Sequence, residues 1–118
     1  MTNKRPARPG GRIKRGWSKR PLYNFPQTIF SLQNTGGKQL DHVMSEVIEV
    51  QEACLDTSVP YDDIAHEMAD LTHSLETFWR ILERTRGKSY VQGVFNEVEG
   101  KNELRGYYVL EGAADGMS

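Results

Sequence analysis

Two stretches, KQLDHVMSEVIEVQEACL (residues 38–55) and YDDIAHEMADLTHSLETFWRILERTR (residues 61–86), decide the fold of this 118-residue chain. Apolar side chains recur in both at steps of three and four residues, as on one face of an α-helix. These side chains are Leu40, Val43, Met44, Val47 and Cys54 in the first stretch, and Ile64, Met68, Leu71, Leu75, Phe78 and Leu82 in the second. Because the break DTSVP (residues 56–60) is short, we expect the two helices to pack antiparallel through these stripes.

Turn-forming residues and a glycine mark the ends of the second helix. We expect Thr57 or Ser58 to cap its first turn, with Pro60 inside that turn. Gly87 should stop the helix, since glycine readily adopts the left-handed conformation that follows a helix.

Shorter helices are predicted on both sides of this pair. One covers Gln27–Leu32 after Pro26 and is broken by the TGG sequence of residues 35–37. The other covers Ser89–Glu99 and ends at Gly100. The side chains expected to face inward are Ile29, Phe30 and Leu32 in the former, and Val91, Val94, Phe95 and Val98 in the latter.

The predicted fold class is all-α, a small helical bundle without strands. The apolar stripes are too wide for one chain of 118 residues to bury, so we expect a homodimer or homotetramer to complete the bundle. Residues 1–21 are rich in proline, glycine and basic side chains, and we predict a disordered tail there. Residues 22–110 form the helical domain, and residues 111–118 a flexible C-terminal tail.

Charge is distributed unevenly along the chain. Residues 1–20 hold eight of the 15 Lys and Arg residues and none of the 16 Asp and Glu residues. The chain is therefore an acidic body with a basic tail. The tail has three interpretations: nucleic-acid binding with Trp17 stacking on a base, docking on the acidic body of another subunit or partner, or a solvated extension.

Composition excludes several classes of protein. The single cysteine, Cys54, leaves no disulfide framework and no multi-cysteine zinc site. We expect it to be a small core residue in a reducing, cytoplasmic setting. No apolar run approaches the roughly 18 residues of a membrane span, and no apolar segment follows the basic N-terminus as in a secretory signal. We therefore expect no membrane association.

Four carboxylates stand out in the two long helices. Glu46 and Glu49 in the first, like Glu67 and Asp70 in the second, are spaced i, i+3 and share one helical face. At about 100° per residue both pairs border the apolar stripe in the same geometry, so antiparallel packing brings all four together. Residues 39–60 contain no Lys or Arg. Clustered carboxylates repel one another unless a cation neutralises them, and oxygen ligands favour Mg²⁺, Mn²⁺ or Ca²⁺.

Other interpretations of these side chains stay open. Acid pairs on amphipathic helices are often solvated faces. Glu52 repeats the spacing from Glu49, so it is an alternative ligand. His66 and His73 lie at helical spacing, but HEMAD (residues 66–70) lacks the second histidine of a zinc-binding HExxH motif. We expect these two histidines on the polar face or behind the ligands.

The carboxylates and a later segment together resemble a known family. EVIE (residues 46–49), a spacer of 17 residues and EMAD (residues 67–70) match an ExxE…ExxD signature, and KNELRGYY (residues 101–108) follows the last expected helix. This combination resembles the MazG-like, all-α nucleoside triphosphate pyrophosphohydrolases over about residues 27–108. Ser45 departs from the doubled glutamate of many relatives, and the basic tail has no counterpart in the minimal domain.

The resemblance implies hydrolysis of an NTP or dNTP between the α- and β-phosphates, which gives a nucleoside monophosphate and pyrophosphate. It implies Mg²⁺ as cofactor, with Mn²⁺ as a possible substitute, and one glutamate acting through the attacking water. The implied metal ligands and catalytic groups are Glu46, Glu49, Glu67 and Asp70. The implied phosphate- and base-binding residues are Lys101, Asn102, Arg105, Tyr107 and Tyr108. Further candidates for a base pocket are Gln27, Phe30 and Gln33.

Two other hypotheses belong to different functional classes. In the first, the chain is a non-catalytic helical binding module whose acids face solvent or a partner, while residues 1–20 bind nucleic acid. In the second, it is a metal-dependent phosphohydrolase that releases phosphate instead of pyrophosphate. His42 has no role in any of these hypotheses, and we expect it at the surface.

Overall fold

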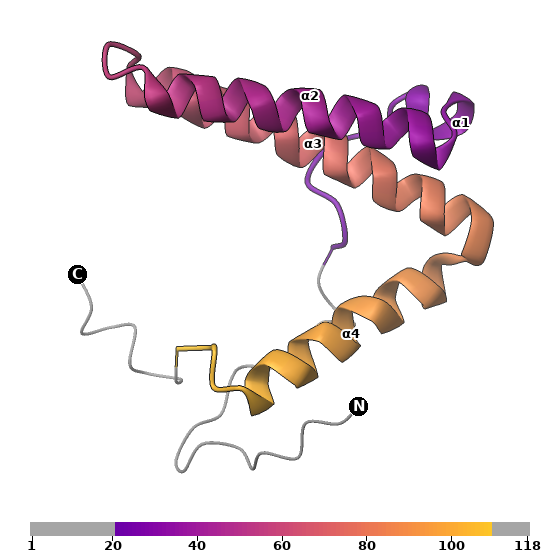
Figure 1. Ribbon diagram of the computed structural model, residues 1–118. Helices are drawn as coiled ribbons and strands as arrows, with labels where there is room; N and C mark the ends of the chain where they lie inside the picture. The colour runs from indigo at the N-terminus through magenta and orange to yellow at the C-terminus, as the bar shows by residue number, and fades with distance from the viewer. Residues whose placement is uncertain (1–20, 110–118) are drawn as a thin grey trace. The chain divides into compact units, whose positions relative to one another are not determined.

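The computed structural model describes residues 21–109, and within that range it contains four α-helices and no strand (Figure 1). The helices are α1 (Phe30–Gln33), α2 (Gly36–Leu55), α3 (Tyr61–Arg86) and α4 (Lys88–Leu104). The predicted all-α class is thus confirmed for these residues. The chain divides into two compact units, one of which is Pro21–Lys88 with α1 to α3, while the other contains α4 from Ser89 onward. The predicted tails lie outside the described residues, apart from Pro21.

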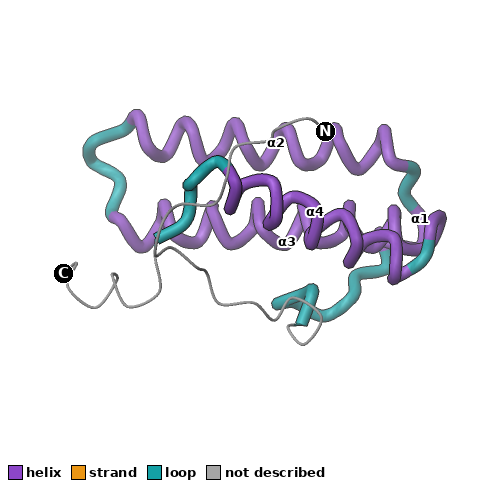
Figure 2. The backbone as a smooth tube through the Cα atoms, turned by 90° about the horizontal axis from the view of Figure 1, so that it is seen from below, coloured by secondary structure: helices purple, strands orange, loops and turns teal. Residues whose placement is uncertain are grey.

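Helices α2 and α3 form the antiparallel pair that the sequence predicted. They lie side by side in both views, and residues 56–60 connect them (Figures 1 and 2). The bounds of α3 are close to the predicted ones: the helix runs from Tyr61 to Arg86 and is followed by Gly87, which has a φ of 100°. Pro60 precedes the helix and does not lie in its first turn, so that part of the prediction is wrong. Both signals are local, because proline removes a backbone donor and glycine tolerates positive φ.

The predicted side-chain cap of α3 is wrong. Pro60 itself is the N-cap residue, and no side chain caps the helix. Ser58 instead donates its backbone N–H and its hydroxyl to Asp56 Oδ1, at 3.0 and 2.6 Å. The serine therefore stabilises the connecting loop, because a short polar side chain can bond to nearby groups of a turn as well as to the free N–H groups at the start of a helix.

Glycines interrupt the helices less than predicted. Thr35 caps α2 by accepting a hydrogen bond from the N–H of Lys38 at 3.2 Å, so the expected break is the first turn of the helix. N–H groups in a first turn have no intrahelical partner. The two glycines at this position therefore cost the helix little stability. Helix α4 likewise continues through Gly100 to Leu104, because one glycine in a helix costs only about 1 kcal/mol relative to alanine.

The actual end of α4 lies in the RGYY sequence. Gly106 has a φ of 75°, its N–H donates to the Glu103 carbonyl at 3.0 Å, and the N–H of Tyr107 donates to the Asn102 carbonyl at 3.0 Å. These two bonds form a Schellman cap, in which a left-handed glycine satisfies the last carbonyls of a helix. Part of the segment quoted for the family resemblance thus has a structural role.

The α1–α3 unit buries more polar residues than apolar ones. Its buried apolar residues are Val43 and Ile81, and its buried polar residues are Ser31, Asn34, Gln39, Ser74, Glu76 and Thr77. Many side chains predicted to face inward are exposed, namely Ile29, Phe30, Leu32, Leu40, Met44, Val47, Cys54, Met68 and Leu75. These core predictions are wrong for a single chain, because two helices cover only one flank of each other's apolar stripe.

Residues 21–29 are tied to α3 by side chains of that helix. Glu76, which is only 7% exposed, accepts hydrogen bonds from the backbone N–H groups of Asn24 and Phe25. Arg80 donates to the Phe25 carbonyl at 2.9 Å and stacks on Tyr23, whose hydroxyl donates to Glu83 at 2.8 Å. Burial and the Glu83 carboxylate raise the pKa of Tyr23. These contacts hold residues 21–29, the segment that leads into α1, against α3.

No helix within residues 21–109 combines the length and the apolar character needed to cross a lipid bilayer.

Candidate functional site

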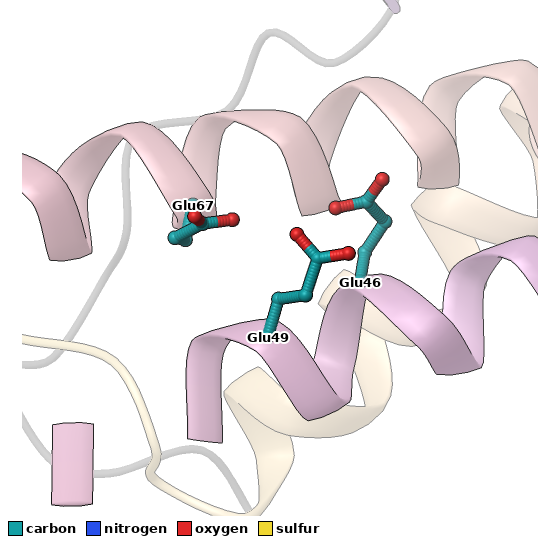
Figure 3. A group of neighbouring side chains, drawn as sticks. All are labelled: Glu46, Glu49 and Glu67. Carbon is teal, nitrogen blue, oxygen red and sulfur yellow. The ribbon is translucent and has the colours of Figure 1, made fainter. Parts of the chain in front are cut away.

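Three of the four predicted carboxylates meet between α2 and α3. Glu46 and Glu49 project from α2 and Glu67 from α3, and each offers an oxygen within 4.8 Å of the other two. Figure 3 shows the three carboxylates pointing toward one another. The i, i+3 spacing places the first two on one face, and the antiparallel packing brings the third to them from the neighbouring helix.

Asp70 and Glu52 lie outside this group of three. The exposed Asp70 still raises the pKa of both Glu46 and Glu67 through its charge. Glu52 is also exposed and lines a cavity of about 420 Å³ together with Glu49 and Glu67. The structure thus brings together three of the four predicted ligands. The alternative ligand, Glu52, lines the same cavity as two of them.

The environment of Glu46 and Glu67 opposes the negative charge of these two carboxylates. Glu46 Oε1 and Glu67 Oε1 are buried and have no hydrogen-bond partner among the described residues. Burial raises the pKa of Glu46, and the charges of Glu49 and Asp70 raise it further. Burial likewise raises the pKa of Glu67, and the neighbouring carboxylates of Glu49, Asp70 and Glu46 raise it further. A proton or a cation at this position relieves the repulsion.

His42 contacts the cluster, although the sequence analysis assigned it no role. Its Nε2 lies 3.5 Å from Glu46 Oε2, and its Nδ1 lies 2.8 Å from the hydroxyl oxygen of Ser74. The side chain is half exposed, which agrees with the predicted surface position. Its i, i+4 spacing from Glu46 is a signal that could have identified the contact, because such residues are neighbours on a helix.

The other two histidines do not join the carboxylates in a metal-ligand group. Within residues 21–109 no second group of three or more potential ligands occurs. His66 Nδ1 lies 2.7 Å from the Asp62 carbonyl oxygen, and the ring of His73 stacks on Phe25 with centroids 4.3 Å apart. This ring contact accounts for the half-buried side chain of His73.

A second cavity of about 260 Å³ lies beside α1 and the first turns of α2. Its lining residues are Phe30, Gln33, Asn34, Lys38, Gln39 and His42. Two of the predicted base-pocket residues, Phe30 and Gln33, thus line one cavity. The third, Gln27, is not in its lining, and its side-chain amide donates to Ser31 Oγ at 2.7 Å. Because His42 also touches Glu46, this cavity is adjacent to the carboxylate cluster.

The predicted phosphate- and base-binding residues belong to the unit that contains α4. Lys101 and Asn102 lie in the last turn of that helix, and the guanidinium of Arg105 lies 5.8 Å from the centroid of the Tyr107 ring. Tyr107 is exposed and Tyr108 half buried. Their roles toward a substrate stay predictions. Comparison with protein-family models, curated proteins and solved structures finds no match to this chain.

Proposed function

We propose that this chain is a Mg²⁺-dependent, MazG-like nucleoside triphosphate pyrophosphohydrolase whose metal is held by the carboxylates of α2 and α3. One observation carries the proposal: Glu46 Oε1 and Glu67 Oε1 are buried on neighbouring helices without a partner among the described residues. The donor set fits Mg²⁺, because it consists of carboxylate oxygens within 4.8 Å of one another. Glu49 completes this group, and Asp70 is the proposed fourth ligand.

The reaction joins water to the α-phosphorus and breaks the bond between that phosphorus and the oxygen that bridges to the β-phosphate. When bound, Mg²⁺ supplies the charge that lets a triphosphate lie beside carboxylates, and it polarises the phosphoryl oxygens. One glutamate of the group is proposed to accept the proton of the attacking water, a role that rests on the family resemblance. The products are a nucleoside monophosphate and pyrophosphate.

Phosphate and base contacts are proposed for the KNELRGYY segment. Lys101 and Arg105 neutralise phosphate charge, and Asn102 hydrogen-bonds the phosphate or the sugar. Tyr107 or Tyr108 stacks on the base or covers the site. These roles rest on the family resemblance of the segment.

The cavity of about 260 Å³ beside α1 is the proposed base pocket. Phe30 offers a half-exposed ring for stacking, and the exposed Gln33 offers a carboxamide to the edge of a base. Gln27 is a less suitable contact, because its amide is already bonded to Ser31.

The active form is proposed to be a homodimer or homotetramer. Leu40, Met44 and Ile48 are exposed at i, i+4 and i+8 on α2, which makes one continuous apolar stripe. A second copy would bury this stripe and complete a helical bundle.

Product analysis with a matched pair of variants tests the proposed function. The chain is incubated with Mg²⁺ and each common NTP and dNTP, and products are resolved by ion-exchange chromatography. We expect monophosphate and pyrophosphate from the parent and from Asp41→Asn, which removes an exposed acid of α2 that lies outside the cluster. Glu67→Gln should lose the activity. Release of phosphate would favour the other phosphohydrolase hypothesis, and no turnover with Mg²⁺ or Mn²⁺ would favour the binding module.

A further inference from the structure

A chain of buried polar side chains runs through the α1–α3 unit to the carboxylate cluster. Asn34 donates its side-chain amide to Gln39 Oε1 at 2.8 Å. Gln39 in turn donates to the backbone carbonyl and the hydroxyl of Ser74, at 3.0 and 3.1 Å. Gln39 and Ser74 are only 2% and 3% exposed, and Asn34 is also buried. The Gln39 amide has one orientation, because a flip would place its nitrogen against the Asn34 nitrogen and its oxygen against the Ser74 carbonyl oxygen.

This network and the Glu46 carboxylate together indicate which nitrogen of His42 carries its hydrogen. Ser74 Oγ accepts from Gln39 and still has a hydrogen and a second lone pair, so it can donate to His42 Nδ1, at 2.8 Å, or accept from it. We infer that it donates, because Nε2 of the same ring faces the Glu46 carboxylate, which can only accept when it is ionised. A neutral imidazole that accepts at Nδ1 carries its hydrogen at Nε2. That nitrogen faces Glu46 Oε2 at 3.5 Å. Every donor in the series from Asn34 onward is therefore directed toward the Glu46 carboxylate.

We propose that His42 is a positioning residue that, held by the Ser74–Gln39–Asn34 network, fixes the Glu46 carboxylate so that Oε1 is presented to the cation. The two oxygens of Glu46 differ in the way this requires: Oε2 faces the imidazole, while Oε1 is buried and has no partner among the described residues. His42 itself is half exposed, so its ring orientation depends on the bond to buried Ser74. Groups behind metal ligands commonly set the orientation of the ligand in this manner. The presence of a cation rests on the proposed function, whereas the hydrogen-bond network is independent of it.

The tautomer of His42 is the readout that needs no metal. Long-range ¹H–¹⁵N NMR spectra of the metal-free chain, at a pH where the ring is neutral, should show His42 with its hydrogen on Nε2. His66 serves as an internal reference of opposite tautomer, because its Nδ1 lies 2.7 Å from the Asp62 carbonyl oxygen, which can only accept. Ser74→Ala should move the His42 signals toward a mixture of tautomers. Thr72→Ala is the matched control, since it removes an exposed hydroxyl of α3 that donates to the Met68 carbonyl.

Calorimetric Mg²⁺ titrations of the full chain then test the effect on the cluster. We expect His42→Leu to weaken Mg²⁺ binding by ~10-fold, as for other residues behind metal ligands. His42→Gln, which keeps a donor on the side chain, should recover part of the loss, and Thr72→Ala should bind like the parent.

The outcomes separate this inference from the proposed function. If Glu67→Gln loses Mg²⁺ binding while His42→Leu binds like the parent, the positioning role is wrong and the metal site stands. An Nδ1-protonated His42, or a tautomer that Ser74→Ala leaves unchanged, would also overturn the inference. If the parent binds no Mg²⁺, the proposed function fails and the positioning role fails with it.

Discussion

Replacing Glu76 with alanine should detach the segment that precedes α1. Its carboxylate is 7% exposed and accepts from two backbone donors: the Asn24 N–H at 3.0 and 2.8 Å from the two oxygens, and the Phe25 N–H at 3.0 Å. A hydrogen bond to a charged acceptor contributes about 1.5–3 kcal/mol. Because Asn24 is exposed and water can replace its bond, we take the lower end for each donor and expect Glu76→Ala to cost ~3 kcal/mol.

Urea denaturation and native-state hydrogen exchange measure this effect. A loss of this size lowers the melting temperature of a small domain by on the order of 12–24 °C. The amides of Asn24 and Phe25 should lose their protection together. Glu76→Gln keeps one carbonyl oxygen, so it should retain about half of the stabilisation. Glu97→Ala, at an exposed position of α4, is the matched control and should stay within about 0.5 kcal/mol of the parent.

A melting temperature for Glu76→Ala within 2 °C of the parent, roughly the shift that 0.5 kcal/mol produces, would refute this reasoning. The same holds if the Asn24 and Phe25 amides of the parent exchange as fast as unprotected ones. Either result would mean that residues 21–29 are not held to α3 by this carboxylate.

Two further predictions concern the carboxylate cluster and the apolar stripe. The pKa values of Glu46 and Glu67 lie above their ordinary value of 4.5, so the folded chain binds more protons than the unfolded chain just above that pH. Without metal, the free energy of unfolding should therefore fall as pH rises from about 4.5 through the raised values; Glu67→Gln should reduce this slope in urea titrations, and an unchanged slope would contradict the assignment. Met44→Glu places a charge in the exposed stripe of α2 and should shift the chain toward a monomer in light scattering, whereas Gln51→Glu, at another exposed position of that helix, should not. A parent chain that is already monomeric would refute the proposed assembly.

Local signals in the sequence determined the helices and their order. Pro60 and Gly87 bound α3 because they change the backbone itself, whatever lies nearby. The i, i+3 spacing of Glu46 and Glu49 likewise ensures a shared face in any helix. The end of α4 was missed at Gly100 because a glycine inside a helix and one that ends it differ in φ, which the sequence does not display.

Only the tertiary structure decided which carboxylates meet. Glu67 joins Glu46 and Glu49 within 4.8 Å, but Asp70, one turn further along α3, does not. The outcome depends on the rotation of α3 against α2 and on side-chain reach, since aspartate is one methylene shorter than glutamate. Helical spacing determines which face of a helix carries each pair of carboxylates. It determines neither the rotation of α3 against α2 nor how far each side chain reaches.

The polar interior was also decided by tertiary packing. Ser74 and Glu76 look like solvated positions between apolar residues of α3, yet both are buried. Their partners lie far away in sequence: Gln39 is separated from Ser74 by 35 positions, and Asn24 from Glu76 by 52. A periodicity of 3.6 residues identifies apolar faces, but a buried hydrogen bond needs two groups whose distance and direction exist only after the chain has folded.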